Sequence, residues 1–426
     1  MWSTAEGAQG GPRGLKGTPG DPEGRKGGRN LPARLQPHLR AGSDPLAPSP
    51  ASSAASAPEK ALFRGRRSHI LEESADCRAI GASEGTGPVQ IGVFDHLDLG
   101  TAPLGAHYEH RLQLVEAYDR LGIGRYHLAE HHATPLGMAP SPSVFLAAVA
   151  QRTRRLRFGP LVYTLSLHHP LRVAEEICML DQLSGGRLEL GVGRGVSPHE
   201  VAYYGVDPAR AQAMYVESLR IILAALAGRS VSYAGEFYTF CEVPFELQPV
   251  QRPHPPLWYG LSRPEALPWV VANRVNIVSN GPPALVRHIT DRYRADWAAA
   301  GHAEGDLPLM GMTRTVVVAA TTAEALATAR RAHKCWHRSF MELWNKHGTR
   351  PINASYPDEF DEAQRLGFGI AGTPATVRDE LQRQITQARV NYLVCRFAFG
   401  DMALAEALGS VELFAHHVMP ELTTPL

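Results

Sequence analysis

The stretch Val89-Gln90-Ile91-Gly92-Val93-Phe94, followed by Asp95-His96-Leu97-Asp98, separates two architectures that the rest of the chain would allow. The apolar run has the length and composition of a buried strand. A doubly wound sheet that binds a dinucleotide predicts a glycine-rich turn directly after its first strand. No such glycines follow Phe94, where two carboxylates and an imidazole stand instead. The stretch therefore favours a closed barrel over an open sheet.

Beyond this strand, short apolar runs alternate with amphipathic helical patterns, which is typical of repeated βα units. The eight expected strands are Val89–Phe94, Arg125–Ala129, Leu156–Val162, Arg187–Gly193, Pro256–Gly260, Val275–Ser279, Met310–Ala320 and Tyr392–Phe399. The expected helices are Tyr108–Leu121, Ser143–Arg154, one after Pro170, Ala209–Ala227, one from Pro264, Pro282–Ala300, Ala323–Lys346, 375–388 and Met402–Met419. Eight consecutive units predict an α/β TIM (β/α)8 barrel. Two stretches interrupt it: residues 229–254, expected to form a hairpin, and residues 347–373.

Residues 1–88 differ in composition from the barrel sequence. They are rich in Gly, Pro, Ser, Ala and Arg and poor in aromatic and β-branched residues. Such a segment buries too little apolar surface to offset the entropy of ordering, so we expect a disordered low-complexity extension. An organellar presequence and an over-extended start of translation both remain open. The predicted organisation is thus an extension at 1–88 and one barrel domain at 89–422.

The overall composition limits the partners of the chain. Its 426 residues carry a net charge of +1, which gives no reason to expect a nucleic-acid or membrane partner. No run of 18 apolar residues is present, so no transmembrane helix is expected. Five widely spaced cysteines without a CxxC pair argue against a disulfide framework and suit a reducing cytoplasm.

Titratable groups gather where the second expected strand ends, in Glu130-His131-His132. All strands of a barrel end at the same mouth, so Asp95 and His96 are expected beside them. Adjacent residues at a strand end point in different directions. One histidine is therefore expected to act as an acid/base and the other to pack in the wall; two wall histidines are the alternative.

A metal site is an alternative interpretation of these residues. Glu130, His131, His132, His96 and Asp98 are all possible metal ligands. Barrel hydrolases, however, usually present a His-x-His pair on the first strand and ligands on later strands, which this chain lacks. We therefore expect no metal site.

The opposite side of the mouth is expected to bind a phosphate. Arg194 stands between Gly193 and Gly195, which would let the backbone approach an anion. Ser262 and Arg263 precede the helix expected from Pro264, and the start of a helix favours a phosphate. Acid/base groups on one side and a phosphate anchor on the other outline a cofactor enzyme.

The motifs together resemble the bacterial luciferase-like flavin monooxygenases. Similar stretches are Leu128–His132 with Gly137 and Pro142, Pro170 with Glu175-Glu176, Leu180-Asp181-Gln182, Ser184–Arg187, Gly193-Arg194-Gly195, Gly372-Thr373-Pro374, Phe397–Gly400 and Val418-Met419-Pro420. Each motif alone is weak, but their order and spacing over about residues 89–422 are specific.

The resemblance implies a TIM barrel, usually dimeric, that uses reduced FMN from a separate NAD(P)H:flavin reductase and O₂ to oxygenate a small organic substrate. It implies that His131 is the catalytic acid/base and that Arg194 grips the FMN phosphate, with Ser262 and Arg263 in the same phosphate loop. It also implies a non-prolyl cis peptide at Leu161-Val162 beside the flavin ring.

Two departures from the family narrow these expectations. The luciferase α subunit carries a reactive cysteine where this chain has Gly193, so thiol chemistry is not expected there. The stretches 229–254 and 347–373 do not resemble luciferase, so neither light emission nor an aldehyde substrate is inferred. Hydride transfer with the deazaflavin F420, known among relatives with this barrel, and a non-catalytic flavin-binding barrel remain as alternatives.

Overall fold

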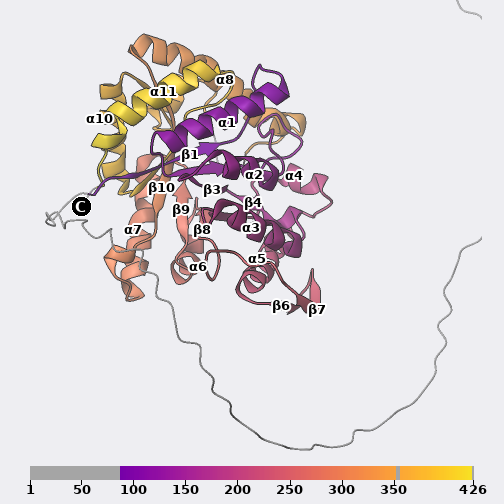
Figure 1. Ribbon diagram of the computed structural model, residues 1–426. Helices are drawn as coiled ribbons and strands as arrows, with labels where there is room; N and C mark the ends of the chain where they lie inside the picture. The colour runs from indigo at the N-terminus through magenta and orange to yellow at the C-terminus, as the bar shows by residue number, and fades with distance from the viewer. Residues whose placement is uncertain (1–86, 352–355, 425–426) are drawn as a thin grey trace, which may run out of the picture. The chain divides into compact units, whose positions relative to one another are not determined.

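The computed structural model describes residues 87–351 and 356–424 of the protein (Figure 1). Its strands are β1 (Gln90–Asp95), β2 (Arg125–Leu128), β3 (Arg157–Pro160), β4 (Tyr163–Thr164), β5 (Leu190–Gly193), β6 (Ser230–Ala234), β7 (Thr239–Pro244), β8 (Leu257–Gly260), β9 (Asn276–Ser279), β10 (Met310–Val318), β11 (Gly369–Gly372) and β12 (Tyr392–Arg396). Its α-helices are α1 (Leu104–Arg120), α2 (Pro142–Arg152), α3 (Pro170–Ser184), α4 (Pro198–Tyr203), α5 (Ala211–Ala227), α6 (Leu267–Ala272), α7 (Pro283–Ala299), α8 (Thr322–Lys346), α9 (Phe360–Arg365), α10 (Pro374–Ala388) and α11 (Leu404–His417).

The main sheet is a parallel barrel, as predicted. Its strands follow one another in the order β3-β2-β1-β12-β10-β9-β8-β5-β4. The circuit closes where Phe158 of β3 bridges to Leu188, just before β5, and where β4 pairs with β5. The helices lie around the outside of these strands (Figure 1). The expected TIM barrel is therefore confirmed, and all its strands end at one mouth.

Local sequence explains where the helices begin and end. Helix α3 starts with Pro170 in its first turn and stops at Gly185, which adopts a left-handed conformation with φ of 65°. Thr321 and Glu324 form a reciprocal capping box at the start of α8. In the described part of the chain, no helix is both long and apolar enough to cross a membrane.

The third barrel strand is not continuous, contrary to our expectation for Leu156–Val162. Strand β3 ends at Pro160 and β4 begins at Tyr163. The peptide bond between Leu161 and Val162 is cis, in agreement with the expectation from the resemblance. This pair of residues thus stands at the mouth rather than within a strand.

Residues 347–373 are not simply an insertion, which corrects a second expectation. They contain α9 and β11, and β11 pairs in parallel with the second half of β10, from Thr315 to Val318. The nine-residue strand β10 is long enough to pair first with β9 and β12 and then with β11. The hairpin expected within residues 229–254 is present as the antiparallel pair β6–β7.

We expect residues 1–88 to be disordered. Residues 1–86 of this segment lie outside the described part of the chain. Pro88 is described and bridges to Thr423, while the Gly87 N–H donates to the Thr424 hydroxyl at 3.1 Å. The barrel unit therefore includes two residues that we had assigned to the extension.

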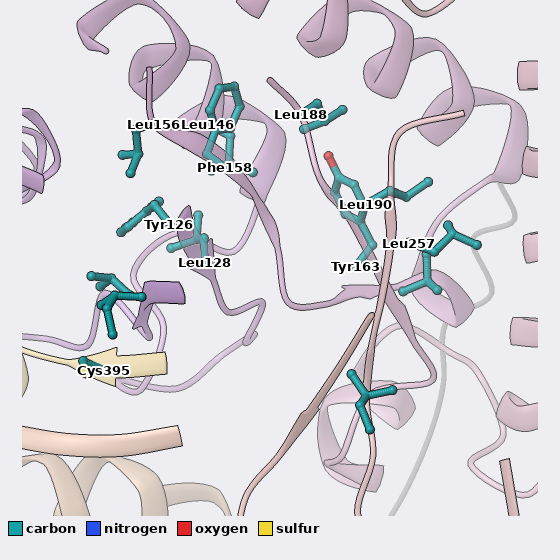
Figure 2. Packing of buried hydrophobic residues seen from close by; sticks show 14 of the residues in the cluster. Tyr126, Leu128, Leu146, Leu156, Phe158, Tyr163, Leu188, Leu190, Leu257 and Cys395 are labelled. Carbon is teal, nitrogen blue, oxygen red and sulfur yellow. The ribbon is translucent and has the colours of Figure 1, made fainter. Parts of the chain in front are cut away.

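Apolar side chains fill both the barrel and the layer between strands and helices. Figure 2 shows part of the outer layer, where Tyr126, Phe158 and Leu190 lie among other buried residues. Inside the barrel, Trp258 and Tyr392 are fully buried and pack with 5.1 Å between ring centroids. Gly311 leaves the space that Tyr392 occupies, because a Cβ there would lie 2.8 Å from the Tyr392 ring.

Glycine is required where β3 and β5 approach to close the barrel. A Cβ on Gly191 would overlap the carbonyl group of Pro160, a backbone atom that cannot rotate away. We predict that Gly191→Ala lowers the free energy of unfolding by about 1–3 kcal/mol or more, because the added methyl overpacks this contact. Gly260→Ala, where a Cβ would meet nothing within 4 Å, should stay within about 0.5 kcal/mol of the parent chain. Chemical denaturation of both variants measures the difference, and equal stabilities would refute this account of closure.

Candidate active site

The structure brings most of the predicted site residues to the mouth of the barrel. Asp95 ends β1 and His96 follows it, while Glu130, His131 and His132 follow β2. The rings of His96 and His131 stack with 5.7 Å between their centroids. The first two strands therefore deliver a pair of neighbouring imidazoles.

Glu130 is the centre of a buried hydrogen-bond network. Its side chain is fully buried, and its Oε1 lies 2.8 Å from both His132 Nε2 and His168 Nε2. Its Oε2 accepts the Thr164 N–H at 3.1 Å. Burial alone would raise the pKa of Glu130, but the hydrogen bonds from the two imidazoles outweigh burial and lower it. Glu130 is thus an ionised structural carboxylate.

His132 belongs to the wall of the site. Its Nε2 faces Glu130, and its Nδ1 lies 2.8 Å from the Tyr204 hydroxyl. With Nε2 as the donor, Nδ1 accepts from Tyr204, so both ring nitrogens are engaged. The two adjacent histidines therefore have different hydrogen-bond partners: His132 contacts Glu130 and Tyr204, and His131 contacts Glu200.

His131 is held by a residue that the sequence analysis missed. Its Nδ1 lies 3.1 Å from Glu200 Oε1, and the other Glu200 oxygen accepts the backbone N–H of His132 at 2.8 Å. Glu200 lies on α4, where Ser197 caps the helix by accepting the Glu200 N–H. His131 Nε2 makes no hydrogen bond to any residue that the structure describes, so it is the ring nitrogen available to a ligand. A Cβ on Gly137 would lie 2.7 Å from His131 Cβ, so this glycine lets the loop pack closely.

The two neighbouring imidazoles have opposite proton affinities. For His131, burial alone would lower the pKa, but the charge and hydrogen bond of Glu200 outweigh burial and raise it above 6.5. For His96, burial lowers the pKa well below 6.5, and Arg396 and protonated His131 lower it further. At neutral pH His96 is therefore uncharged, while His131 can exchange a proton.

Asp95 has a structural role, because both of its carboxylate oxygens already accept hydrogen bonds from the protein. Its Oδ1 accepts the Leu97 N–H at 2.7 Å and its Oδ2 accepts the Tyr126 hydroxyl at 3.0 Å. Asp98 accepts the Gly400 N–H at 2.6 Å, and Arg111 lies between the two carboxylates, at 3.8 and 3.5 Å. Burial raises the pKa of Asp98 to about 6. These groups join the end of β1 to the loop after β12.

The three residues expected to bind a phosphate follow neighbouring strands. Arg194 follows β5, Ser262 and Arg263 follow β8, and β5 pairs with β8. The Arg194 side chain has no carboxylate within 4.0 Å among the described residues; its one hydrogen bond goes to the Gly195 carbonyl at 3.4 Å. Gly195 has a φ of 89°, and a Cβ on it would lie 2.6 Å from Thr164 Cγ2. The helix expected from Pro264 is short, a 3₁₀ turn followed by α6, so its dipole adds little to an anion site.

The sequence contained a signal for the residue that was missed. Ser197 and Glu200 have the S-x-x-E spacing of a helix start, but the helix that follows has only six residues. His168 and Tyr204, which complete the Glu130 network, lie far from it in sequence. Over residues 87–351 and 356–424, no three His, Cys, Asp or Glu side chains converge in an arrangement that could hold a metal ion.

A profile of known sequences matches residues 89–391 of this chain, and its description is luciferase-like monooxygenase. The chain belongs to the luciferase-like monooxygenase family. It is 45% identical over 318 residues to the uncharacterized protein y4wF of Sinorhizobium fredii, covering 75% of this chain and 93% of that protein. It is 31% identical to 4-hydroxyprotoasukamycin monooxygenase of Streptomyces nodosus subsp. asukaensis, covering 72% and 85%. A 173-residue stretch is 30% identical to the oxygenase component of flavin-dependent trigonelline monooxygenase of Acinetobacter baylyi, covering 40% and 48%.

Similar solved structures share the barrel. Monooxygenase RslO1 of Streptomyces bottropensis has a TM-score of 0.69 at 25% identity, covering 78% of this chain and 99% of that one. The oxygenating constituent of 3,6-diketocamphane monooxygenase of Pseudomonas putida, solved with FMN, has a TM-score of 0.67 at 19% identity, covering 79% and 99%. The coenzyme F420-dependent tetrahydromethanopterin reductase of Methanopyrus kandleri has a TM-score of 0.57 at 20% identity, covering 79% and 100%. Proteins similar to this family member thus use either flavin or F420.

We predict that Glu200→Gln lowers the pKa of His131, because the variant removes the charge that raises it. Protonation of His131 stabilises the fold below about pH 6.5, and this contribution is lost as the pH rises through its folded-state pKa. The variant should therefore be destabilised more in acid than above neutrality. NMR titration of labelled histidines measures the pKa, with His131→Asn to assign the resonance and the exposed Glu342→Gln as control. An unchanged His131 titration in Glu200→Gln would contradict the role of Glu200.

Proposed function

We propose that this protein is a flavin-dependent monooxygenase that uses reduced FMN and O₂ to oxygenate a small organic substrate. The observation that carries the proposal is the pairing, at one barrel mouth, of His131, held by Glu200, with the free guanidinium of Arg194. The named monooxygenases among its relatives support the reaction class.

The residues at the mouth fit FMN. Arg194 would hold the phosphate, because its side chain has no carboxylate partner among the described residues and its planar fork of donors suits a phosphate. Ser262 and Arg263, both exposed on the neighbouring strand end, would complete the phosphate site. Leu161 and Val162, half-buried at the break between β3 and β4, would lie against the flavin ring. Reduced FMN would supply the electrons for the activation of O₂.

His131 would act as the acid/base. Glu200 fixes its Nδ1, so proton exchange with substrate or cofactor occurs at Nε2. Its raised pKa keeps a protonated fraction at neutral pH, which a proton donor needs. His96 and His132, with Glu130 behind them, would form the wall that orients this ring.

We further propose that a separate NAD(P)H:flavin reductase supplies the reduced FMN. The relative named as an oxygenase component supports a division into two proteins. A cytoplasmic location is proposed on the cysteines: Cys178, Cys241, Cys335 and Cys395 are all free thiols.

We also propose a homodimer. The adjacent helices α2 and α3 expose Val144, Met179 and Leu183, of which Val144 is 73% exposed, and such apolar side chains favour association. A monomer in sedimentation velocity at micromolar concentration would rule the dimer out.

Anaerobic titration with reduced FMN and, separately, reduced F420, followed by air, tests the proposed function. We expect reduced FMN to bind and air to produce a transient absorbance change distinct from that of free reduced FMN. Preference for F420 without O₂ consumption would move the protein to hydride transfer. Flavin binding without turnover by any reductant would indicate a non-catalytic barrel.

His131→Ala should lower turnover by about 10²–10⁴-fold and leave FMN affinity unchanged, because the variant removes an acid/base but no phosphate contact. Steady-state O₂ consumption and FMN titration measure the two effects. The exposed His288→Ala serves as the control. Near-normal activity of His131→Ala would show the assignment to be wrong.

Arg194→Gln should weaken FMN binding by about 10–100-fold, since a charge-assisted contact to the phosphate is lost. Riboflavin, which has no phosphate, should bind the variant and the parent chain equally. The exposed Arg220→Gln on α5 is the matched control. An equal loss of both ligands would place Arg194 at the ring instead of the phosphate.

A further inference from the structure

Arg396, the last residue of β12, is a buried cation at the barrel mouth. Only 8% of its surface is exposed. Its Nε and Nη2 donate to the Thr315 hydroxyl, at 3.1 and 2.5 Å, and its Nη1 lies 3.4 Å from His96 Nδ1. No carboxylate of the described residues comes within 4.0 Å of it. A buried arginine is normally paired with an acid, so this one has capacity for an anion.

The nearest carboxylates are already engaged by another arginine. Asp95 and Asp98 lie on either side of Arg111, and the oxygens of both also accept hydrogen bonds from the backbone. Burial lowers the pKa of Arg396, and the attraction of Asp98 and Asp95 does not reverse this. The positive charge of Arg396 is therefore only partly compensated by its surroundings.

An aromatic cluster packs beside this cation, with Trp336 fully buried and Phe340 and Tyr356 half-buried. The Arg396 guanidinium lies 3.9 Å from the ring centroid of Trp336, which packs against Phe340 at 5.4 Å and Tyr356 at 5.1 Å. The indole N–H of Trp336 is buried and has no acceptor among the described residues. A flat apolar body with an acceptor at its edge would suit these groups.

The cation lies close to the acid/base. His96 contacts Arg396 on one side, and its ring stacks on His131 at 5.7 Å on the other. A group bound at Arg396 is thus one imidazole ring away from His131. Arg396 lies at the end of β12 and Arg194 at the end of β5, and these strands are not neighbours in the barrel. The two cations therefore provide separate anion positions.

We propose that Arg396 anchors a carboxylate of the substrate, so that the preferred substrates are small aromatic carboxylates. Arg396 binds the anion through its Nη1 side and His96 borders it. The half-buried rings of Phe340 and Tyr356 pack against the substrate ring, and the fully buried Trp336 supports them from behind. This inference rests on the proposed function, because it takes this side of the mouth to be the substrate side. It adds to that function the chemical class of the substrate.

Benzoate and its neutral isostere benzamide test the proposal without turnover. Calorimetric titration of the FMN-loaded protein should show benzoate binding about tenfold or more tighter than benzamide. Arg396→Gln should abolish this preference, and Arg396→Lys, which keeps the charge but loses the fork, should retain part of it. The exposed Arg338→Gln on α8 is the matched control and should behave as the parent chain.

The outcomes separate this inference from the proposed function. Equal binding of the two probes by the parent chain would overturn the inference, even if Arg396→Gln fails to fold. So would loss of benzoate binding in Arg194→Gln with retention in Arg396→Gln, or weaker FMN binding as the main effect of Arg396→Gln. The same titrations without FMN still test Arg396 if the protein proves not to use a flavin.

Discussion

The buried carboxylate of Glu130 is the interaction on which the geometry of the mouth depends. An ionised carboxylate inside a protein is stable only when hydrogen bonds replace its water. Here two imidazoles and one backbone N–H do so, and they come from the loop after β2, from β4 and from the turn that leads to α3. His132 extends this network to Tyr204 beyond α4. His131 lies between Glu130 and His132 in the sequence. Because the network fixes these two residues, it also restrains the orientation of His131.

The charged and titratable groups of the mouth lie at the ends of different strands. The imidazoles of His96 and His131 follow β1 and β2, while Arg194 stands at the end of β5 with no carboxylate within 4.0 Å among the described residues. A low-dielectric wall strengthens each of these interactions relative to water. In the proposed roles, this arrangement would keep the Arg194 guanidinium available to an anion, because the Glu200 carboxylate contacts His131 and not Arg194.

The sequence predicted the barrel strands and most helices well, because apolar periodicity is a local property of the chain. It failed for short elements whose existence depends on partners. Strand β11 is Gly-Ile-Ala-Gly and forms only because the long β10 offers it an edge. Helix α4 has six residues, too few for a periodic pattern.

In the candidate site too, residues in local motifs were predicted, whereas partners that are distant in sequence were not. His131 and Arg194 stand in motifs at strand ends, and the Leu161–Val162 pair was expected from the resemblance to the family. Glu200 contacts His131 across 69 residues, and Arg396 contacts His96 across 300. Such pairs depend on how the barrel closes, which no short motif encodes. The sequence thus indicated which residues stand at the strand ends. It did not indicate which side chains from distant loops contact them.

Helix α4 has one more consequence. Arg194 and Glu200 belong to the same short segment after β5, so whatever orders the guanidinium also restrains the carboxylate that sets the proton affinity of His131. Thermodynamic linkage makes this relation reciprocal. By this linkage, an anion bound at Arg194 would change how readily His131 takes up a proton, and the affinity for that anion would vary with pH. The segment from Arg194 to Glu200 thus connects the end of β5 to the histidine that follows β2.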